Sequence, residues 1–328
     1  MHVLIYTGWP VNAWRIPAEQ VARLQSTFHE TTFIHATTAD EASRDIANVD
    51  ASLSPFLTQA ILGRATRLRW VHSSAAAVAD LLPLEELARR DIIVTNSRGV
   101  QAIPMAEQVI AGLLLLARRL DLTMAAQRER RWIQEQLGDV DRPWMLHGKS
   151  MTIIGLGSIG EAIAERAHAF GMRITGVRRR PEQPAPPFVH RILGANQLDD
   201  ALKGADVIVI AAPFVAATTR LIGNEQLKLI NRGAILVNVG RAQIVDTDAM
   251  IRALEDGRLG GAVLDVFEHE PLDPSSPLWA MHNVVITPHS AGFRATHWHD
   301  VVDLFADNLR RFQRGDPLHN VVDPAAGY

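Results

Sequence analysis

Apolar positions along the chain follow two patterns, short continuous runs and longer segments with helical spacing. The short runs are rich in β-branched residues and bounded by turn-forming residues, which is typical of buried strands. They predict strands at 2–6, 32–35, 51–53, 68–73 and 92–96, and in a second series at 151–154, 173–177, 206–212, 234–239, 261–265 and 284–287. Helical spacing predicts helices at 17–28, 161–170, 224–230, 247–256 and 296–315. Because strands alternate with helices, we expect an α/β fold with two doubly wound parallel sheets.

A long helical stretch, 103–131, joins the two series of strands. Its first half contains the run 109–117, which is apolar on almost every side of a helix. Such a helix must be buried on every side. It could lie in the core, or part of its surface could meet a second subunit. A chain of 328 residues has room for two cores, since single cores stop growing at about 250–300 residues.

Composition and charge exclude several classes of protein. The formal net charge is -3 and the hydrophobic fraction is 47%, which is typical of a globular protein and not of a basic nucleic-acid-binding surface. The chain has no cysteine, so disulfides and thiolate metal sites are excluded, and we predict no metal site. The run 109–117 is far shorter than the roughly 20 residues of a membrane helix, and the first residues lack a signal-peptide pattern. We expect a soluble cytoplasmic protein with no membrane or nucleic-acid partner.

A glycine pattern follows the strand predicted at 151–154. Gly155, Gly157 and Gly160 form a G-x-G-x-x-G sequence between that strand and a helix, the context in which this pattern binds dinucleotides. Gly155 would allow the tight turn, Gly157 would let the backbone approach a pyrophosphate, and Gly160 would let helix and strand pack closely. The N–H groups of Ser158 and Ile159 would bind the anion at the helix N-terminus. The alternative is a glycine-rich turn without a ligand.

The next predicted strand ends in a basic turn that bears on the choice of dinucleotide. NAD-specific folds place a carboxylate about 20 residues after the glycines, where it binds the ribose 2′-hydroxyl. This chain has Arg178 there, with Arg179 and Arg180 beside it, and no carboxylate before Glu182. A guanidinium can bind a 2′-phosphate through paired hydrogen bonds, whereas a carboxylate would repel it. We therefore expect NADP(H) to be preferred, with NAD(H) possible; the alternative is a solvated basic turn.

Three further motifs carry a cation, a carboxylate and a histidine. Arg241 follows Gly240 at the end of one predicted strand. Glu270 precedes Pro271, and His289 follows the last predicted strand. Ligands of open α/β sheets bind at the carboxyl edge, where such residues lie. A guanidinium binds carboxylates, and a histidine can give or take a proton near neutral pH. After a nucleotide-binding unit, these are the groups needed to move a hydride to or from a carbonyl carbon.

The order and local sequence of these motifs, 238–242, 265–271 and 287–292, resemble the D-isomer-specific 2-hydroxyacid dehydrogenase family over nearly the whole chain. The resemblance implies that His289 is the general acid when a 2-keto acid is reduced and the base in the reverse reaction. It implies that Glu270 orients the imidazole and stabilises its charged form. It also implies that Arg241 binds the substrate carboxylate and polarises the 2-keto oxygen.

The resemblance extends to cofactor and substrate contacts. It implies that Asp265 holds the nicotinamide carboxamide, and that Arg241 and His289 also border the cofactor. The other cofactor contacts that it implies are Ala212, Pro213, Thr218 and Val239. It implies substrate contacts from the backbone of Ala76 and Ala77, although this chain has Ala77 and Ala79 where the family pattern has glycine and aspartate. Four tryptophans are candidates to line the pocket for the substrate side chain, namely Trp9, Trp14, Trp144 and Trp298.

The resemblance also implies a domain arrangement and an activity. A Rossmann cofactor domain, 101–290, is expected to be inserted into a discontinuous flavodoxin-like substrate domain, 1–100 plus 291–328, in a homodimer. The expected activity is hydride transfer between NADP(H) and a small 2-keto or D-2-hydroxy acid, mainly the reduction of acids such as glyoxylate and hydroxypyruvate. The alternative is a dinucleotide-sensing, corepressor-like binding protein with the same fold.

Overall fold

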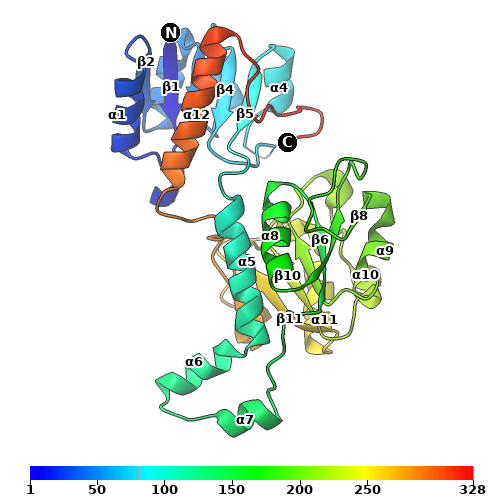
Figure 1. Cartoon of the computed structure of the whole chain (residues 1–328). Helices are drawn as coiled ribbons and strands as arrows, with labels where there is room; N and C mark the ends of the chain where they lie inside the picture. Colours follow the sequence, from blue (N-terminus) through cyan, green and yellow to red (C-terminus); the bar gives the residue numbers. More distant parts are fainter. Residues whose placement is uncertain (80, 328) are drawn as a thin grey trace. The chain divides into compact units, whose positions relative to one another are not determined.

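The computed structural model describes residues 1–79 and 81–327. The chain forms two compact units (Figure 1). The first comprises Met1–Gln101 and Phe293–Tyr328, and the second comprises Ala102–Gly292. The first unit therefore consists of two separate stretches of the sequence, with the second unit between them.

A five-stranded parallel sheet organises the first unit, in the strand order β2-β1-β3-β4-β5. The strands are β1 (His2–Tyr6), β2 (Thr32–Ala36), β3 (Ala51–Leu53), β4 (Trp70–Ser73) and β5 (Ile93–Asn96). Along β1, Leu4 packs in one hydrophobic cluster, whereas Val3 and Ile5 pack in another. Both faces of the sheet are thus buried, which explains why its strands read as continuous apolar runs. This is the flavodoxin-like strand order, as predicted.

Helices cover both faces of this sheet. They are α1 (Ala18–Thr27), α2 (Ala39–Asp45), α3 (Gln59–Leu62), α4 (Leu84–Arg89) and α12 (His297–Arg314). The helix α12 comes from the end of the chain and packs beside α1, with Val301 and Phe305 in the same cluster as Val3 and Ile5. It ends at Gly315, whose φ of 75° is the left-handed conformation typical of a helix C-terminus.

A seven-stranded parallel sheet organises the second unit, in the order β12-β11-β10-β9-β6-β7-β8. The strands are β6 (Ser150–Ile154), β7 (Arg173–Val177), β8 (Arg191–Leu193), β9 (Val207–Ile210), β10 (Ala234–Asn238), β11 (Leu259–Leu264) and β12 (Val284–Ile286). The strand order reverses between β6 and β9. Such a reversal opens a crevice at the carboxyl edge of the sheet, where open α/β folds bind their ligands.

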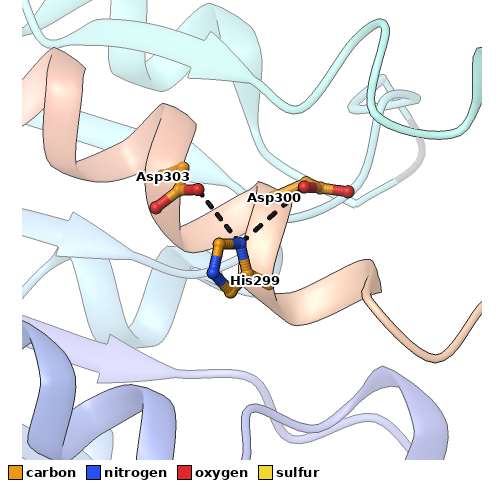
Figure 2. A group of neighbouring side chains, drawn as sticks. All are labelled: His299, Asp300 and Asp303. Carbon is orange, nitrogen blue, oxygen red and sulfur yellow. Dashed lines mark ion pairs between the residues drawn. The ribbon is translucent and has the colours of Figure 1, made fainter.

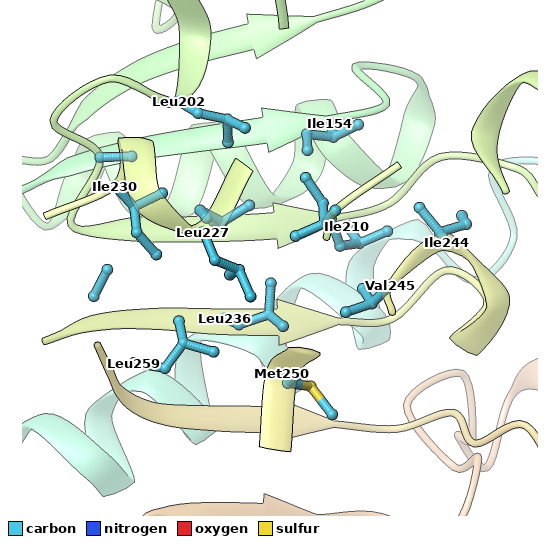
Figure 3. Packing of buried hydrophobic residues seen from close by; sticks show 14 of the residues in the cluster. Ile154, Leu202, Ile210, Leu227, Ile230, Leu236, Ile244, Val245, Met250 and Leu259 are labelled. Carbon is cyan, nitrogen blue, oxygen red and sulfur yellow. The ribbon is translucent and has the colours of Figure 1, made fainter. Parts of the chain in front are cut away.

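Helices pack on both faces of the second unit's sheet, and two further helices extend from the end of the first of them (Figure 1). They are α5 (Ala102–Ala117), α6 (Leu120–Arg128), α7 (Gln134–Asp139), α8 (Ser158–Ala169), α9 (Leu198–Leu202), α10 (Asn224–Leu229) and α11 (Thr247–Glu255). One cluster brings Leu227 of α10 and Met250 of α11 against strand residues such as Ile210 and Leu236 (Figure 3). A second cluster packs α5 and α8 on the opposite face. The doubly wound α/β prediction is confirmed.

The long helical stretch predicted at 103–131 is not one continuous helix. It is broken between α5 and α6, because Arg119 takes a left-handed backbone conformation with a φ of 53°. Within the single chain the run 109–117 is not covered on every side, since Leu113 is fully buried whereas Ala111 is exposed; the alternative that a second subunit covers part of this helix stays a prediction. The apolar run therefore marks a core helix with one open side. No bounds were predicted for the short elements α2, α3, α4, α7, α9 and β8.

Candidate active site

Five adjacent parallel strands of the second unit, β6 and β9 to β12, end at one edge of the sheet, and each is followed by a predicted site residue. Gly155 follows β6, Ala212 follows β9, Val239 and Arg241 follow β10, Asp265 follows β11, and His289 follows β12. At the strand reversal the ends of β6 and β9 are in contact. A Cβ atom on Gly155 would lie 2.5 Å from the nitrogen of Ala212. The sheet therefore gathers residues that are far apart in the sequence.

The glycine turn after β6 has the shape that a dinucleotide pyrophosphate requires. Gly155 has a φ of 98°, and a Cβ on Gly160 would lie 2.2 Å from the carbonyl oxygen of Gly155, so the helix packs directly on the turn. By contrast, a Cβ on Gly157 would have no described atom within 4 Å. Open space therefore lies beside the backbone of Gly157, at the N-terminus of α8. The N–H groups of Ser158 and Ile159 have no carbonyl partner within the helix, which suits an anion there.

The basic turn after β7 has a defined conformation. Arg178 is half-buried, and its Nη2 donates hydrogen bonds to the carbonyl oxygens of Gln183 and Pro184 in the same loop. Its Nε is buried and has no hydrogen-bond partner within the described residues. Arg179 is exposed. The guanidinium of Arg178 thus lies against its own loop, and a 2′-phosphate would have to compete with two carbonyl oxygens for it.

Arg241 begins the turn after β10. Its Nη1 donates a hydrogen bond to the carbonyl oxygen of Gly240 at 2.9 Å, and the side chain is half-buried. Gly240 is required there because a Cβ would lie 2.9 Å from the carbonyl oxygen of Ala212. The buried Asn238 holds the turn on both sides: its Oδ1 accepts from Gly240 N–H at 3.0 Å, and its Nδ2 donates to the carbonyl oxygen of Arg241 at 3.1 Å.

His289 and Glu270 form a direct pair. The Nδ1 of His289 lies 2.7 Å from Oε2 of Glu270, with the two side chains 49% and 35% exposed. An ionised carboxylate only accepts hydrogen bonds, so the proton of this bond belongs to Nδ1, and Nε2 is the ring nitrogen left for chemistry. The other oxygen of Glu270 accepts from Phe267 N–H at 3.0 Å. The nearby Glu268 instead accepts from Thr247 at 3.0 Å.

Asp265 is buried beneath the turn that carries His289. Its Oδ1 accepts hydrogen bonds from Thr287 Oγ1 at 2.6 Å, Ser290 N at 2.9 Å and Ala291 N at 3.1 Å. Its Oδ2 accepts from Ala291 N at 3.1 Å. The resemblance implies a nicotinamide contact for this carboxylate; the structure shows that it already satisfies three donors of the 287–291 turn. His289 itself has a φ of 51°, a left-handed conformation that costs roughly 1–2 kcal/mol for a residue other than glycine.

The remaining cofactor residues predicted from the resemblance lie near these strand ends. Ala212 is buried and Pro213 is exposed. Thr218 donates to the carbonyl oxygens of Pro213 and Val215, both at 3.0 Å, and so closes the loop that follows β9. Val239 is 4% exposed and belongs to the core. A contact of Val239 with a cofactor would therefore have to come from its backbone.

The predicted substrate turn belongs to the first unit. Ala76 and Ala77 are half-buried, and neither is among the described residues with positive φ, so alanine is tolerated where the family pattern has glycine. Asn96 holds the turn by donating from Nδ2 to the carbonyl oxygen of Ala76 at 2.7 Å. The next residue, Ser97, donates from Oγ to the carbonyl oxygen of Ser73 at 2.9 Å.

His72 lies beneath this turn and is fully buried. Its Nδ1 lies 2.8 Å from Oγ1 of Thr95, and its Nε2 lies 3.2 Å from Oγ of Ser97. Trp70 donates from Nε1 to the same Thr95 oxygen at 2.9 Å. Burial lowers the pKa of His72 to about 3. The histidine is therefore neutral at physiological pH and links β4 to β5 directly below the turn.

The four candidate tryptophans have separate environments. Trp298 is 6% exposed and donates from Nε1 to the carbonyl oxygen of Ala13, so it is a core residue. Trp9 packs edge-on against Phe56, with ring centroids 4.5 Å apart. Trp14 contacts Phe293 and His297, with centroids 4.6 and 4.8 Å apart. Trp144 belongs to the second unit, where it packs against the cluster of α5 and α8.

One group of side chains outside this site has the composition of a metal site. On α12, Nδ1 of His299 lies 3.1 Å from Asp303 and 3.9 Å from Asp300 (Figure 2). Each carboxylate is already paired with an arginine: Asp303 with Arg23 at 2.6 Å, and Asp300 with Arg294. These guanidinium groups would repel a cation, so we interpret the cluster as an ion-pair network.

Comparison with known proteins identifies the family. The model of the D-isomer specific 2-hydroxyacid dehydrogenase NAD-binding domain matches residues 110–291. A glyoxylate reductase of Pyrococcus furiosus is 37% identical over 283 residues, covering 84% of this chain and 82% of the relative. The chain belongs to the D-isomer specific 2-hydroxyacid dehydrogenase family. The resemblance predicted from the motifs is therefore confirmed.

Two solved structures of D-isomer specific 2-hydroxyacid dehydrogenase type extend this comparison. A D-isomer specific 2-hydroxyacid dehydrogenase from Xanthobacter autotrophicus, in complex with NADPH and MES, has a TM-score of 0.82 and 30% identity, covering 99% of each chain. An NADPH-dependent glyoxylate/hydroxypyruvate reductase from Sinorhizobium meliloti, in complex with NADP and sulfate, has a TM-score of 0.82 and 25% identity, covering 100% of this chain and 99% of that one. The corepressor-like alternative is not favoured by these relatives. Within the described residues, no helix is long and apolar enough to cross a membrane.

Three residues that support the site of this dehydrogenase are not among the predicted site residues. They are Asn238, Thr287 and His72, each of which bonds a turn that carries a predicted residue or lies directly beneath one. Their common signal is a polar side chain at or next to the end of a buried strand. That signal is weak in the sequence alone, because asparagine and threonine also form ordinary turns.

Proposed function

We propose that this protein reduces small 2-keto acids to D-2-hydroxy acids with NADPH as the hydride donor. The observation that carries the proposal is the 2.7 Å pair of His289 and Glu270, at the same carboxyl edge of the sheet where Arg241 follows β10. The names of the two reductases above support glyoxylate and hydroxypyruvate as the first substrates to test. The second unit serves as the cofactor domain and the first as the substrate domain, with Ala76 and Ala77 contributing backbone contacts.

The roles of the side chains follow from their chemistry. The bound dinucleotide supplies a hydride to C2 of the keto acid. Negative charge then grows on the keto oxygen, and the guanidinium of Arg241 stabilises it while also binding the carboxylate. His289 delivers a proton to that oxygen from Nε2, because Nδ1 is engaged by Glu270. The carbonyl thus becomes a hydroxyl group, and in the reverse direction the same nitrogen removes its proton.

The glycine turn and the basic turn are assigned to the dinucleotide. The open space beside Gly157 would take the pyrophosphate, with the N–H groups of Ser158 and Ile159 bound to it. Arg178 and Arg179 would bind the 2′-phosphate of NADP(H). A charge-assisted hydrogen bond contributes roughly 1.5–3 kcal/mol, so a single one favours NADP(H) over NAD(H) by about tenfold or more. In this proposal NAD(H) remains a weaker alternative.

A homodimer completes the proposal. The segment of α6 and α7 extends from the end of α5 (Figure 1) and exposes several large apolar side chains. Trp132 is 89% exposed, Val140 77% and Met145 64%. Exposed apolar residues gathered on one segment mark an interaction surface, and a second copy of the chain is the partner that a symmetric enzyme would place there. A cytoplasmic location stays a prediction, which cell fractionation would test.

NADPH oxidation measured with a panel of 2-keto acids tests this function. We expect saturable turnover with glyoxylate, hydroxypyruvate or a larger 2-keto acid, and a lower KM for NADPH than for NADH. A simple aldehyde of similar size is the matched control, since it lacks the carboxylate that Arg241 binds. Only trace turnover with every 2-keto acid, together with tight dinucleotide binding, would instead indicate a binding protein.

A further inference from the structure

The residues proposed to act on the substrate, Arg241 and His289, belong to turns. A turn holds a side chain in place only if other groups fix its backbone. Arg241 belongs to the turn after β10, and His289 to the turn after β12. A misplacement of about 1 Å can reduce turnover roughly a hundredfold. The structure contains side chains that hold each of these turns, and they occupy equivalent places on neighbouring strands.

Asn238 is the last residue of β10, and Asp265 is the first residue after β11. Each is only 2% exposed, although asparagine and aspartate rarely lie so deep. The two are joined directly, because the N–H of Asp265 donates to the carbonyl oxygen of Asn238 at 3.1 Å. Together they form a polar layer at the carboxyl edge of the sheet, which we call the Asn238–Asp265 layer.

Each member of the layer is bonded to the turn of one reacting residue. The side-chain oxygen of Asn238 accepts a hydrogen bond from the N–H of Gly240, and its side-chain nitrogen donates one to the carbonyl oxygen of Arg241. Asp265 binds the turn of His289 on both sides, through Thr287 before it and Ser290 and Ala291 after it. Its own carbonyl oxygen also accepts from the N–H of His289 at 2.9 Å.

The Asp265 bonds also account for the unusual backbone of His289. A left-handed residue other than glycine persists only where its surroundings fix it. Here the carboxylate binds the N–H groups of the two residues that follow His289, and the backbone of Asp265 binds that of His289. The side chain is thereby fixed where Nδ1 meets Glu270.

We propose that Asn238 and Asp265 are the positioning residues of the reaction, Asn238 for Arg241 and Asp265 for His289. This inference rests on the proposed function and assigns a separate task to each residue. Asn238 acts on substrate binding and on the charge that grows on the keto oxygen, because Arg241 binds the carboxylate and stabilises that charge. Asp265 acts on proton transfer, because it holds His289. It does so in addition to any contact with the nicotinamide.

A comparison of KM and kcat tests the two tasks. Asn238→Asp keeps the acceptor for Gly240 but cannot donate to Arg241, and we expect it to raise the KM for the keto acid about tenfold or more and to lower kcat as well, because Arg241 serves both binding and charge stabilisation. Thr287→Val removes one donor to Asp265 without changing its carboxylate. We expect it to lower kcat about tenfold, with the KM for the keto acid nearly unchanged. Dinucleotide affinity, measured by fluorescence titration, should stay within about twofold in both.

The matched control is Thr247→Val, which removes the same atoms from an exposed hydrogen bond to Glu268 and should leave both constants unchanged. If Asn238→Asp and Thr287→Val changed kcat and KM in the same way and both weakened dinucleotide binding, the two residues would have a general structural role, and the inference would be overturned. A silent Thr287→Val would overturn the role of Asp265. These outcomes require an active wild-type enzyme; a wild type inactive on every 2-keto acid would refute the proposed function instead.

Discussion

The buried His72 makes the stability of the first unit depend on pH. Its folded-state pKa of about 3 lies well below the value of about 6.5 for an unfolded histidine. The unfolded chain therefore binds the proton at higher pH, and stability falls as the pH drops from about 6.5 towards 3. At pH 5 the difference is about 1.5 pH units, which corresponds to about 2 kcal/mol lost at this one residue.

Among the described residues, no charged side chain offsets the effect of burial, which lowers the pKa of His72. In the part of the chain that the structure describes, its ring forms hydrogen bonds with the hydroxyl groups of Thr95 and Ser97, and the aromatic rings beside it are those of Trp70 and Phe305. Because Ser97 also bonds the backbone of Ser73, protonation should loosen the turn that carries Ala76 and Ala77.

Urea unfolding at pH 7 and pH 5, followed by circular dichroism, measures this effect. We expect His72→Gln to be less stable than the wild type at pH 7, because a glutamine cannot satisfy both hydroxyl groups. Its loss of stability between pH 7 and pH 5 should nevertheless be smaller by about 2 kcal/mol. The exposed His29→Gln serves as the control and should retain the wild-type pH dependence. An unchanged pH dependence in His72→Gln would refute the reasoning.

Three further predictions concern activity and assembly. Arg241→Lys keeps the charge but loses the planar fork, so kcat/KM for the keto acid should fall at least tenfold in steady-state assays, and full activity would contradict the role of the fork. Replacing Arg178 and Arg179 by alanine should raise the KM for NADPH about tenfold more than the KM for NADH, whereas the control Arg173→Ala should change neither. Equal increases in the two KM values would remove the argument for NADP(H). Trp132→Ser should shift the protein from dimer to monomer in light scattering, and an unchanged mass would exclude Trp132 from the interface.

Much of the fold could be predicted because a strand of a buried parallel sheet has a recognisable local sequence, a short run of apolar residues between turns and helices. A strand such as β6 is buried on both faces, so its apolar run is continuous and its neighbours are turns and helices. The break at Arg119 could not be predicted in the same way, since arginine is a good helix former and its left-handed conformation depends on the surrounding structure. The sequence left two interpretations of α5 open, a core helix or a helix partly covered by a second subunit, because an apolar residue does not reveal what covers it.

The candidate site was predictable to the extent that motifs mark it. The glycine turn can be recognised in the sequence because its glycines cannot be replaced by larger residues. A Cβ atom on Gly160, for example, would lie 2.2 Å from the carbonyl oxygen of Gly155. Asn238, Thr287 and His72 did not stand out, because their function depends on partners that are distant in the sequence. Which donors satisfy Asp265 becomes visible only once β11 and β12 lie side by side.

The most direct test of the central claim is to follow the hydride itself. NADPH labelled with deuterium at the transferred position of the nicotinamide ring should be incubated with the protein and a 2-keto acid with a prochiral C2, such as hydroxypyruvate. Mass spectrometry and chiral chromatography would then identify the product. We expect the D-2-hydroxy acid with one deuterium at C2, formed by the wild type and almost abolished in His289→Ala. Product without deuterium, or an undiminished rate in His289→Ala, would contradict the account.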